Sequence, residues 1–224
     1  MGKDAAADLN WYAPQFVDTG KTTTDINAIK LTDEEGNVGW GDILQIAGPL
    51  GSPAATYFYW DSSMDPNEKA TERYWGDEDC NPVDVSFDKA EGFAFDNPNA
   101  TEFKIVDSGE VIAEKVQFSA DADLNWFGNP FPVAININAI LLTDEEGNVG
   151  WGDILQIAGP LGSPAATYFY WDPSMDPNEK ATERYWGDED CNPVDVTFQP
   201  GDAFAIDNPN ATVFDIIITP PYSL

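Results

Sequence analysis

The chain contains the same sequence twice. Leu31–Val85 and Leu142–Val196 match at an offset of 111 residues, and the single change is Ser62 to Pro173. The match continues more loosely on both sides, so each copy spans about half of the chain, which predicts two copies of one folding unit. We predict modules at residues 1–108 and 109–224. We interpret the divergent ends as contacts with different neighbours; random drift after a recent duplication is the alternative.

The apolar runs in each copy are short and rich in β-branched and aromatic residues, which is typical of strands. The strand candidates are Ile43–Ala47, Thr56–Trp60, Val83–Phe87, Phe103–Val106, Ala134–Leu142 and Phe214–Thr219. Turn residues separate these runs at 33–37, 48–53 and 96–99. The one helical candidate is Asp65–Arg73, in which Asp65 would cap a helix that starts at Pro66. The pattern predicts an all-β fold of two tandem β-sandwich-like modules, Ig-like or jelly-roll-like, with about seven or eight strands each.

The charge balance excludes several partners. The formal net charge is -30, from 40 acidic and 10 basic residues, and there is no His. Nucleic acids and anionic membranes require clustered basic residues, so we expect neither as a partner. No apolar run is long enough to predict membrane insertion. The charge fits either a cation-rich medium outside the cell or simple solubility.

The start of the second copy resembles a known kind of repeat. Leu124–Gly128 is followed by Asn129-Pro130-Phe131-Pro132, and this stretch is similar to modules of large bacterial secreted proteins in which N-x-x-G-N-P-[FY]-P opens a β-rich unit. Tyr170-Trp171-Asp172 and Pro200–Phe204 match later elements of that module. Copy one departs from the pattern at Tyr12–Phe16 and Lys89–Gly92. The resemblance implies an extracellular or cell-surface location and brings no catalytic residues. Met1–Asp4 does not begin a signal peptide, so we expect a removed signal or an internal fragment.

Catalysis is not expected. Without His the commonest general base is missing, and most carboxylates lie in predicted turns. Our leading hypothesis is a non-enzymatic structural subunit of an extracellular filament or surface layer that polymerises with itself, head to tail. The alternative is a carbohydrate-binding or adhesive module, because exposed Trp and Tyr beside carboxylates suit glycans.

Two acidic loops are candidates for calcium binding, since hard cations prefer several oxygen ligands on one loop. The candidate ligands are Asp77, Asp79 and Asp84 and their equivalents Asp188, Asp190 and Asp195. The spacing is not that of an EF-hand, and a solvated acidic loop is the alternative. We expect no other cofactor.

Each copy also carries one cysteine and one glycosylation sequon. Cys80 and Cys191 cannot form a disulfide within a copy, so each is either an inert thiol or the site of a bridge to another module or chain. Asn99 and Asn210 begin the two sequons at equivalent turns.

The ends of the copies predict a mode of assembly. Val116 and Phe118 share one face of a strand candidate before copy two, whereas residues 1–7 offer no comparable strand. We therefore expect copy one to expose a vacant sheet edge, to which another chain could add. Phe214, Ile216 and Ile218 of the tail could fill that place in the next molecule and give an open polymer. The alternative is that the missing strand belongs to an upstream repeat.

Overall fold

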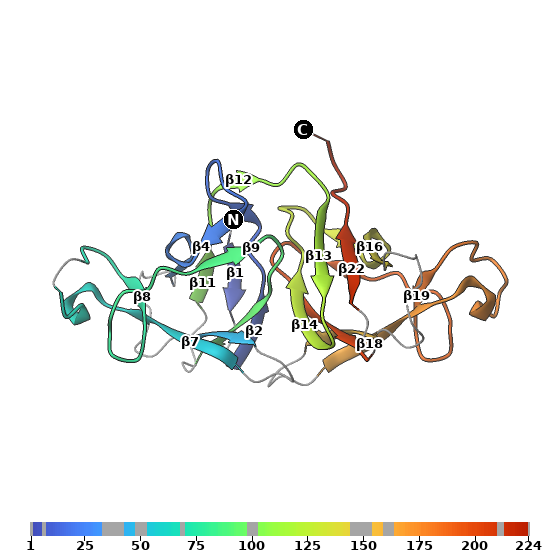
Figure 1. Cartoon of the computed structure of the whole chain (residues 1–224), viewed down its shortest axis with the longest axis horizontal. Coiled ribbons are helices and arrows are strands. Elements are labelled where there is room, and N and C mark those ends of the chain that lie inside the picture. The colour runs from blue at the N-terminus through green and yellow to red at the C-terminus, as the bar shows by residue number, and fades with distance from the viewer. Residues whose placement is uncertain are drawn as a thin grey trace.

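A computed structural model of the chain describes residues 2–5, 8–32, 43–47, 53–67, 70–97, 103–143, 154–158, 164–209 and 213–223. The fold is all-β, as the sequence predicts, and the two copies form similar halves of an elongated molecule (Figure 1). Short 3-10 turns are the only helical elements in the described residues, and none of them is long and apolar enough to cross a membrane.

Copy one is built from antiparallel sheets. A three-stranded sheet has the order β1-β11-β5, with β1 at Gly2–Ala5, β11 at Phe103–Val106 and β5 at Lys30–Thr32. A five-stranded sheet has the order β2-β10-β6-β7-β8, with strands at Asp8–Tyr12, Phe93–Asn97, Ile43–Ala47, Pro53–Trp60 and Tyr74–Gly76. A small ladder joins β4 (Thr23–Asp25) to β9 (Ser86–Asp88).

Copy two repeats this order. Its three-stranded sheet is β13-β22-β16, with strands at Val116–Ala120, Phe214–Ile218 and Ile140–Thr143. Its five-stranded sheet is β14-β21-β17-β18-β19, with strands at Asp123–Gly128, Ala203–Asn208, Ile154–Ala158, Pro164–Trp171 and Tyr185–Gly187. The small ladder is β15 (Ile135–Asn136) with β20 (Thr197–Phe198). The connecting segment contributes β12 (Glu110–Val111), which pairs with β3 (Phe16–Val17).

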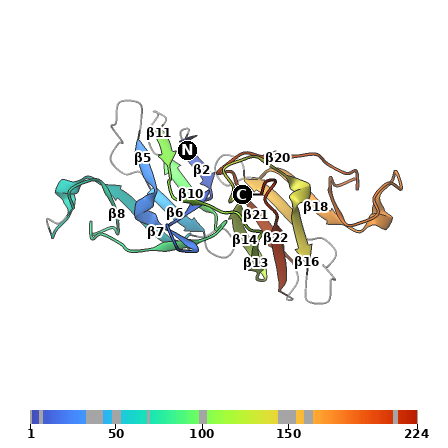
Figure 2. The same ribbon diagram turned by 90° about the horizontal axis from the view of Figure 1, so that it is seen from above.

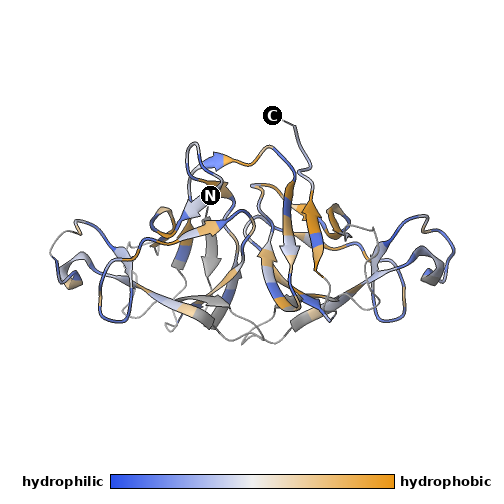
Figure 3. Ribbon diagram, in the orientation of Figure 1, coloured by the Kyte–Doolittle hydropathy of each residue, from blue (hydrophilic) through white to orange (hydrophobic). Residues whose placement is uncertain are grey.

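Each copy has its own hydrophobic core, to which both of its larger sheets contribute. Trp75 and Trp186 are fully buried at equivalent places, and each indole donates a 2.8 Å hydrogen bond, to the carbonyls of Ile29 and Ile140 respectively. Figure 3 shows hydrophobic residues gathered on the central strands and hydrophilic residues in the outer loops. The core thus follows the strand pattern of the sequence. The finer expectation of an Ig-like or jelly-roll-like sandwich stays a prediction.

Several strands occur where the sequence predicts them, including β6 and β11. The long strand predicted at Ala134–Leu142 is wrong, because a 3-10 turn at Ile137–Ala139 divides it into β15 and β16. Asn136 caps this turn by accepting the Asn138 N–H at 2.9 Å, an example of a side chain that competes with strand pairing. The turn predicted at 33–37, residues 48–52 of the turn predicted at 48–53, and residues 98–99 of the turn predicted at 96–99 lie outside the described residues. Asp96 and Asn97 of that last turn instead end strand β10.

The helix predicted at Asp65–Arg73 is wrong. The described residues of this range, 65–67 and 70–73, form turns and bends, and a 3-10 turn lies just before them at Ser62–Met64. The buried carboxylate of Asp65 accepts the N–H groups of Asn67 and Ala70, both at 2.8 Å. These bonds hold a loop in place of a capped helix.

The expectation that residues 1–7 form no strand is also wrong. Gly2–Ala5 forms β1 and pairs with β11 in the register Gly2↔Val106 to Ala5↔Phe103. This is the place that β13 takes beside β22 in copy two. A strand is held by backbone hydrogen bonds, and an edge strand tolerates charged and small residues. Copy one therefore does not leave this edge vacant.

Candidate functional site

The two copies meet at a junction with approximate two-fold symmetry. Trp11 of β2 and its counterpart Trp126 of β14 stack on each other, with ring centroids 3.7 Å apart and an interplanar angle of 3°. Because each residue is the other's equivalent in the repeat, the pair lies where an approximate two-fold axis must pass. Such self-complementary contacts define an isologous interface.

Backbone contacts repeat this symmetry. The Ala13 N–H donates to the Gly201 carbonyl at 3.3 Å, and the Gly128 N–H donates to the Ala90 carbonyl at 3.0 Å. In the repeat, Ala13 corresponds to Gly128 and Ala90 corresponds to Gly201. The bridges Tyr12↔Asp202 and Glu91↔Phe127 are equivalent in the same way. The divergent ends of the copies thus lie at the junction, and the near-identical segments extend outward on opposite sides (Figures 1 and 2).

The segment that connects the copies packs against both of them at the junction. Ile112 is buried in the core of copy two, together with Val17 of copy one. The hydroxyl of Tyr222 donates to the Ile112 carbonyl at 2.8 Å, and the Tyr222 ring packs against Phe131. Residues from both ends of the chain therefore hold this connection in place.

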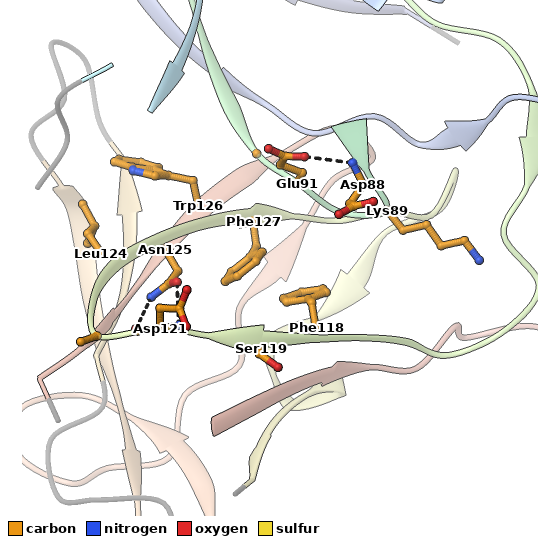
Figure 4. Close-up of a pocket in the computed structure, with 12 residues that line it drawn as sticks. Asp88, Lys89, Glu91, Phe118, Ser119, Asp121, Leu124, Asn125, Trp126 and Phe127 are labelled. Carbon is orange, nitrogen blue, oxygen red and sulfur yellow. Dashed lines mark hydrogen bonds between the residues drawn. The ribbon is translucent and has the colours of Figure 1, made fainter. Parts of the chain in front are cut away.

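A pocket with a volume of about 540 Å³ opens beside the junction (Figure 4). The turn between β9 and β10 of copy one forms one wall, and the β13–β14 hairpin of copy two forms the other. Its lining residues are Asp88, Lys89, Glu91, Gly92, Phe118, Ser119, Asp121, Ala122, Leu124, Asn125, Trp126 and Phe127. Only Phe118 of these was a predicted site residue, as part of the assembly surface, because the pocket depends on how the copies meet.

A buried polar cluster lies on the copy-one side of the junction. Asp107 is 1% exposed, and its Oδ2 accepts the Gln15 N–H at 2.9 Å. Burial raises the pKa of Asp107, and burial together with the charge of Asp107 raises the pKa of Tyr12 well above its ordinary value. Asp107 Oδ1, Gln15 Oε1 and the Tyr12 hydroxyl meet no hydrogen-bond partner of standard geometry in the described part of the chain. The equivalent residues of copy two are Ile218, Pro130 and Phe127. This contrast between aligned residues is the only sequence signal for the cluster.

The two acidic loops are held by hydrogen bonds of their own. Asp77 Oδ1 accepts the N–H groups of Asp79 and Asn81 at 3.0 and 2.9 Å. These bonds, led by those from Asn81, lower the pKa of Asp77, and Asn192 has the same effect on Asp188 in copy two.

The remaining candidate ligands do not gather around Asp77 or Asp188. Asp79, Asp84, Asp190 and Asp195 are exposed, and Asp195 accepts a hydrogen bond from Asn136 Nδ2. Within the described ranges, no group of three or more His, Cys, Asp or Glu side chains is placed to hold a metal ion.

Neither cysteine lines the junction pocket. Cys80 and Cys191 are half-buried free thiols, one in the outer part of each copy. Both have a positive φ, 63° and 61°, in tight turns. Asn99 and Asn210 lie outside the described residues.

The predicted assembly residues belong to the core of copy two. Phe214, Ile216 and Ile218 are buried, and β22 pairs with β13 on one side and β16 on the other. Val116 is buried as well, and Phe118 lines the pocket. The expectation that the tail is free to join another molecule is therefore wrong for this conformation, because both of its edges are already paired.

Comparison with protein-family models, curated proteins and solved structures found no match for this chain.

Proposed function

We propose that the chain is a non-enzymatic structural subunit of an extracellular filament or surface layer, and that it assembles through two equivalent ends. One observation carries this proposal. The segments that are identical in the two copies, apart from Ser62 and Pro173, extend outward on opposite sides of the junction (Figure 1). If the surface at each end binds the same surface of another molecule, a subunit adds a neighbour at both ends and forms an open chain.

The contacts between subunits would be made by side chains and not by strand exchange. The outermost strand β8 has its free edge covered by the loop that follows, since the Val83 N–H donates to the Trp75 carbonyl at 3.0 Å. In the same way, the Val194 N–H donates to the carbonyl of Trp186 in β19 at 3.0 Å. The tail is paired on both sides, as described above. The net charge of -30 opposes association at low salt, so assembly would require cations that screen it.

The cysteines provide a handle for testing this proposal, because there is one at each end and none elsewhere. The unmodified chain should form linear assemblies at about 0.5 M NaCl, where screening acts over a few ångströms. Coupling a bulky maleimide polymer to both thiols should leave monomers. Coupling it to Cys191 alone in a Cys80→Ser variant should stop growth at dimers.

Light scattering during size-exclusion chromatography and negative-stain microscopy would measure these states. The uncoupled Cys80→Ser variant is the control and should assemble like the parent. A parent chain that stays monomeric across salt and protein concentrations would contradict the proposal. Assembly that is unaffected by coupling at both ends would contradict the equivalent-end arrangement.

A carbohydrate-binding or adhesive module is the second candidate. The observation that favours it is the junction pocket, which combines aromatic rings with polar side chains. A glycan-binding function and a structural function are compatible in a surface protein.

A further inference from the structure

The junction pocket has no chemical counterpart on the other side of the approximate two-fold axis. Five of its lining residues are replaced by chemically different residues in the other copy. They are Asp88, Lys89, Phe118, Ser119 and Asp121, which correspond to Gln199, Pro200, Lys3, Asp4 and Ala6. Both copies thus provide the same backbone arrangement, but this combination of pocket side chains occurs once in the chain.

Aromatic rings form the apolar part of the pocket. Phe118 of β13 and Phe127 of β14 stack with centroids 4.0 Å apart and an interplanar angle of 25°. Both rings are half-buried, and they face each other inside the pocket (Figure 4). Trp126 is also partly exposed, although it stacks on Trp11. Aromatic surfaces that retain exposure offer apolar contact to a ligand that is polar at its edges.

Two of the polar lining residues are held in place by hydrogen bonds. Glu91 Oε2 accepts the Asp88 N–H at 2.9 Å. Asn125 bonds both backbone groups of Asp121, accepting its N–H at 3.1 Å and donating to its carbonyl at 2.8 Å. These bonds fix the backbone that carries the Asp88 and Asp121 carboxylates, which preorganises the pocket.

Three other polar groups remain available to a ligand. The Asp88 and Asp121 carboxylates are exposed, and Lys89 is half-buried. Among the described residues, none of these three side chains is recorded in a hydrogen bond or ion pair. The pocket therefore offers acceptors and a donor together with its aromatic rings.

We propose that the junction pocket binds a neutral carbohydrate of about mono- to disaccharide size. The volume of about 540 Å³ lies within the range of roughly 300–1,000 Å³ that is usual for small-molecule sites. Sugar hydroxyls both donate and accept hydrogen bonds, which matches Lys89 and the two aspartates, and the C–H faces of a sugar ring pack on aromatic rings.

Other ligand classes fit the pocket less well. Three carboxylates (Asp88, Glu91 and Asp121) against one lysine disfavour an anionic ligand. Lys89 would find no partner on an apolar ligand. The carboxylates attract a cationic ligand, and the comparison with glucosamine below separates that outcome from binding of a neutral sugar. This inference rests on the second candidate function named above and specifies its ligand class, and it does not depend on the structural function.

Isothermal titration of the full chain with neutral disaccharides tests the proposal. The probes are cellobiose, maltose, lactose and chitobiose, with glucuronic acid as an anionic comparison and glucosamine as a cationic one. At least one neutral disaccharide should bind with one site per chain, since the combination of pocket side chains occurs once. Two sites per chain would instead indicate binding at the repeated outer segments and would overturn the proposal.

Two variants use the residues that the other copy places at the same positions. Asp88→Gln and Asp121→Ala change exposed side chains, so the fold should be retained. Each should weaken the affinity about tenfold, which corresponds to the loss of one good hydrogen bond to a charged group. Asp84→Asn, at an exposed carboxylate outside the pocket, is the matched control and should bind like the parent.

Three further results would overturn the proposal. One is the absence of heat from all four neutral disaccharides at millimolar concentration. Another is tighter binding of glucosamine or glucuronic acid than of every neutral sugar. Loss of binding in Asp84→Asn equal to that in the pocket variants would do the same, because it would place the ligand elsewhere.

Discussion

Gly128 and Ala13 approach each other so closely at the junction that a Cβ placed on Gly128 would lie 2.4 Å from the Ala13 Cβ and 2.5 Å from the Asp202 carbonyl oxygen. The two residues occupy equivalent positions in the repeat, and the alanine is accommodated on one side only. The contact explains why one copy needs glycine here while the other does not.

Gly128→Ala should therefore separate the copies locally. An added methyl group that meets backbone atoms forces shifts that cost about 1–3 kcal/mol, and we expect a value at or above the top of that range. Gly20→Ala is the control, because a Cβ there has nothing within 4 Å and only its φ of 72° is unfavourable, at a cost of about 1–2 kcal/mol. Urea unfolding measures both values. Near-ultraviolet circular dichroism of the stacked Trp pair should change in Gly128→Ala only.

The stack of Trp11 on Trp126 predicts energetic coupling between the copies. In a double-mutant cycle with leucine at both positions, the two changes should couple by about 1 kcal/mol, as stacked aromatic pairs do. Trp60 and Trp171 give a control cycle, because they are equivalent residues that pair with the outermost strands of different copies, β8 and β19. Their effects should add within about 0.5 kcal/mol. Additive effects of Trp11→Leu and Trp126→Leu would show that the stack does not hold the copies together.

Much of the fold is predictable from local sequence, and the junction is not. The run Ile43–Ala47 is apolar and β-branched, so its own composition predicts a strand. Gly2–Ala5 has no such pattern, and it forms a strand because β11 offers it an edge. The stack of Trp11 on Trp126 and the Asp107 cluster depend on how two copies pack. A repeat indicates that such packing exists, but not which residues it brings together.

The buried carboxyl of Asp107 predicts a pH dependence of stability. Its pKa is raised by burial, so the folded state holds the proton more tightly than the unfolded state does. Stability from this group is therefore greatest below the unfolded pKa of about 4 and falls as the pH rises through the raised folded value. Asp107→Asn keeps an acceptor for the Gln15 N–H and removes the charge. Relative to the parent, it should gain stability steadily from acidic to neutral pH.

Urea unfolding of both proteins at several pH values measures this difference. Glu91 also has a raised pKa, and Asp77 and Asp188 have lowered ones. These groups are present in both the parent and the Asp107→Asn variant, so their contributions cancel in the difference between the two free energies of unfolding. A difference that stays constant with pH would mean that Asp107 does not titrate as a buried group.

Substitutions in the tail should destabilise the fold, whereas removal of the first strand should cause association. Ile216 is fully buried, whereas its neighbour Ile217 on the opposite face of β22 is half-buried. Ile216→Ala should cost about 2–5 kcal/mol, as a core deletion does, and Ile217→Ala should cost clearly less. An equal effect of the two changes in urea unfolding would contradict the placement of the tail in the core.

Removal of residues 1–5 should have a different effect, because β1 is an edge strand that, among the described residues, pairs only with β11. Its loss leaves the core in place and exposes the backbone edge of β11, and an unpaired edge is a site where another chain adds. The shortened chain should remain folded but associate through β11, whereas the parent at low salt should not. A peptide with the sequence of residues 1–5, present in excess, should compete for the edge and reduce this association. If the shortened chain is as monomeric as the parent in sedimentation velocity, the pairing of β1 with β11 does not protect the sheet.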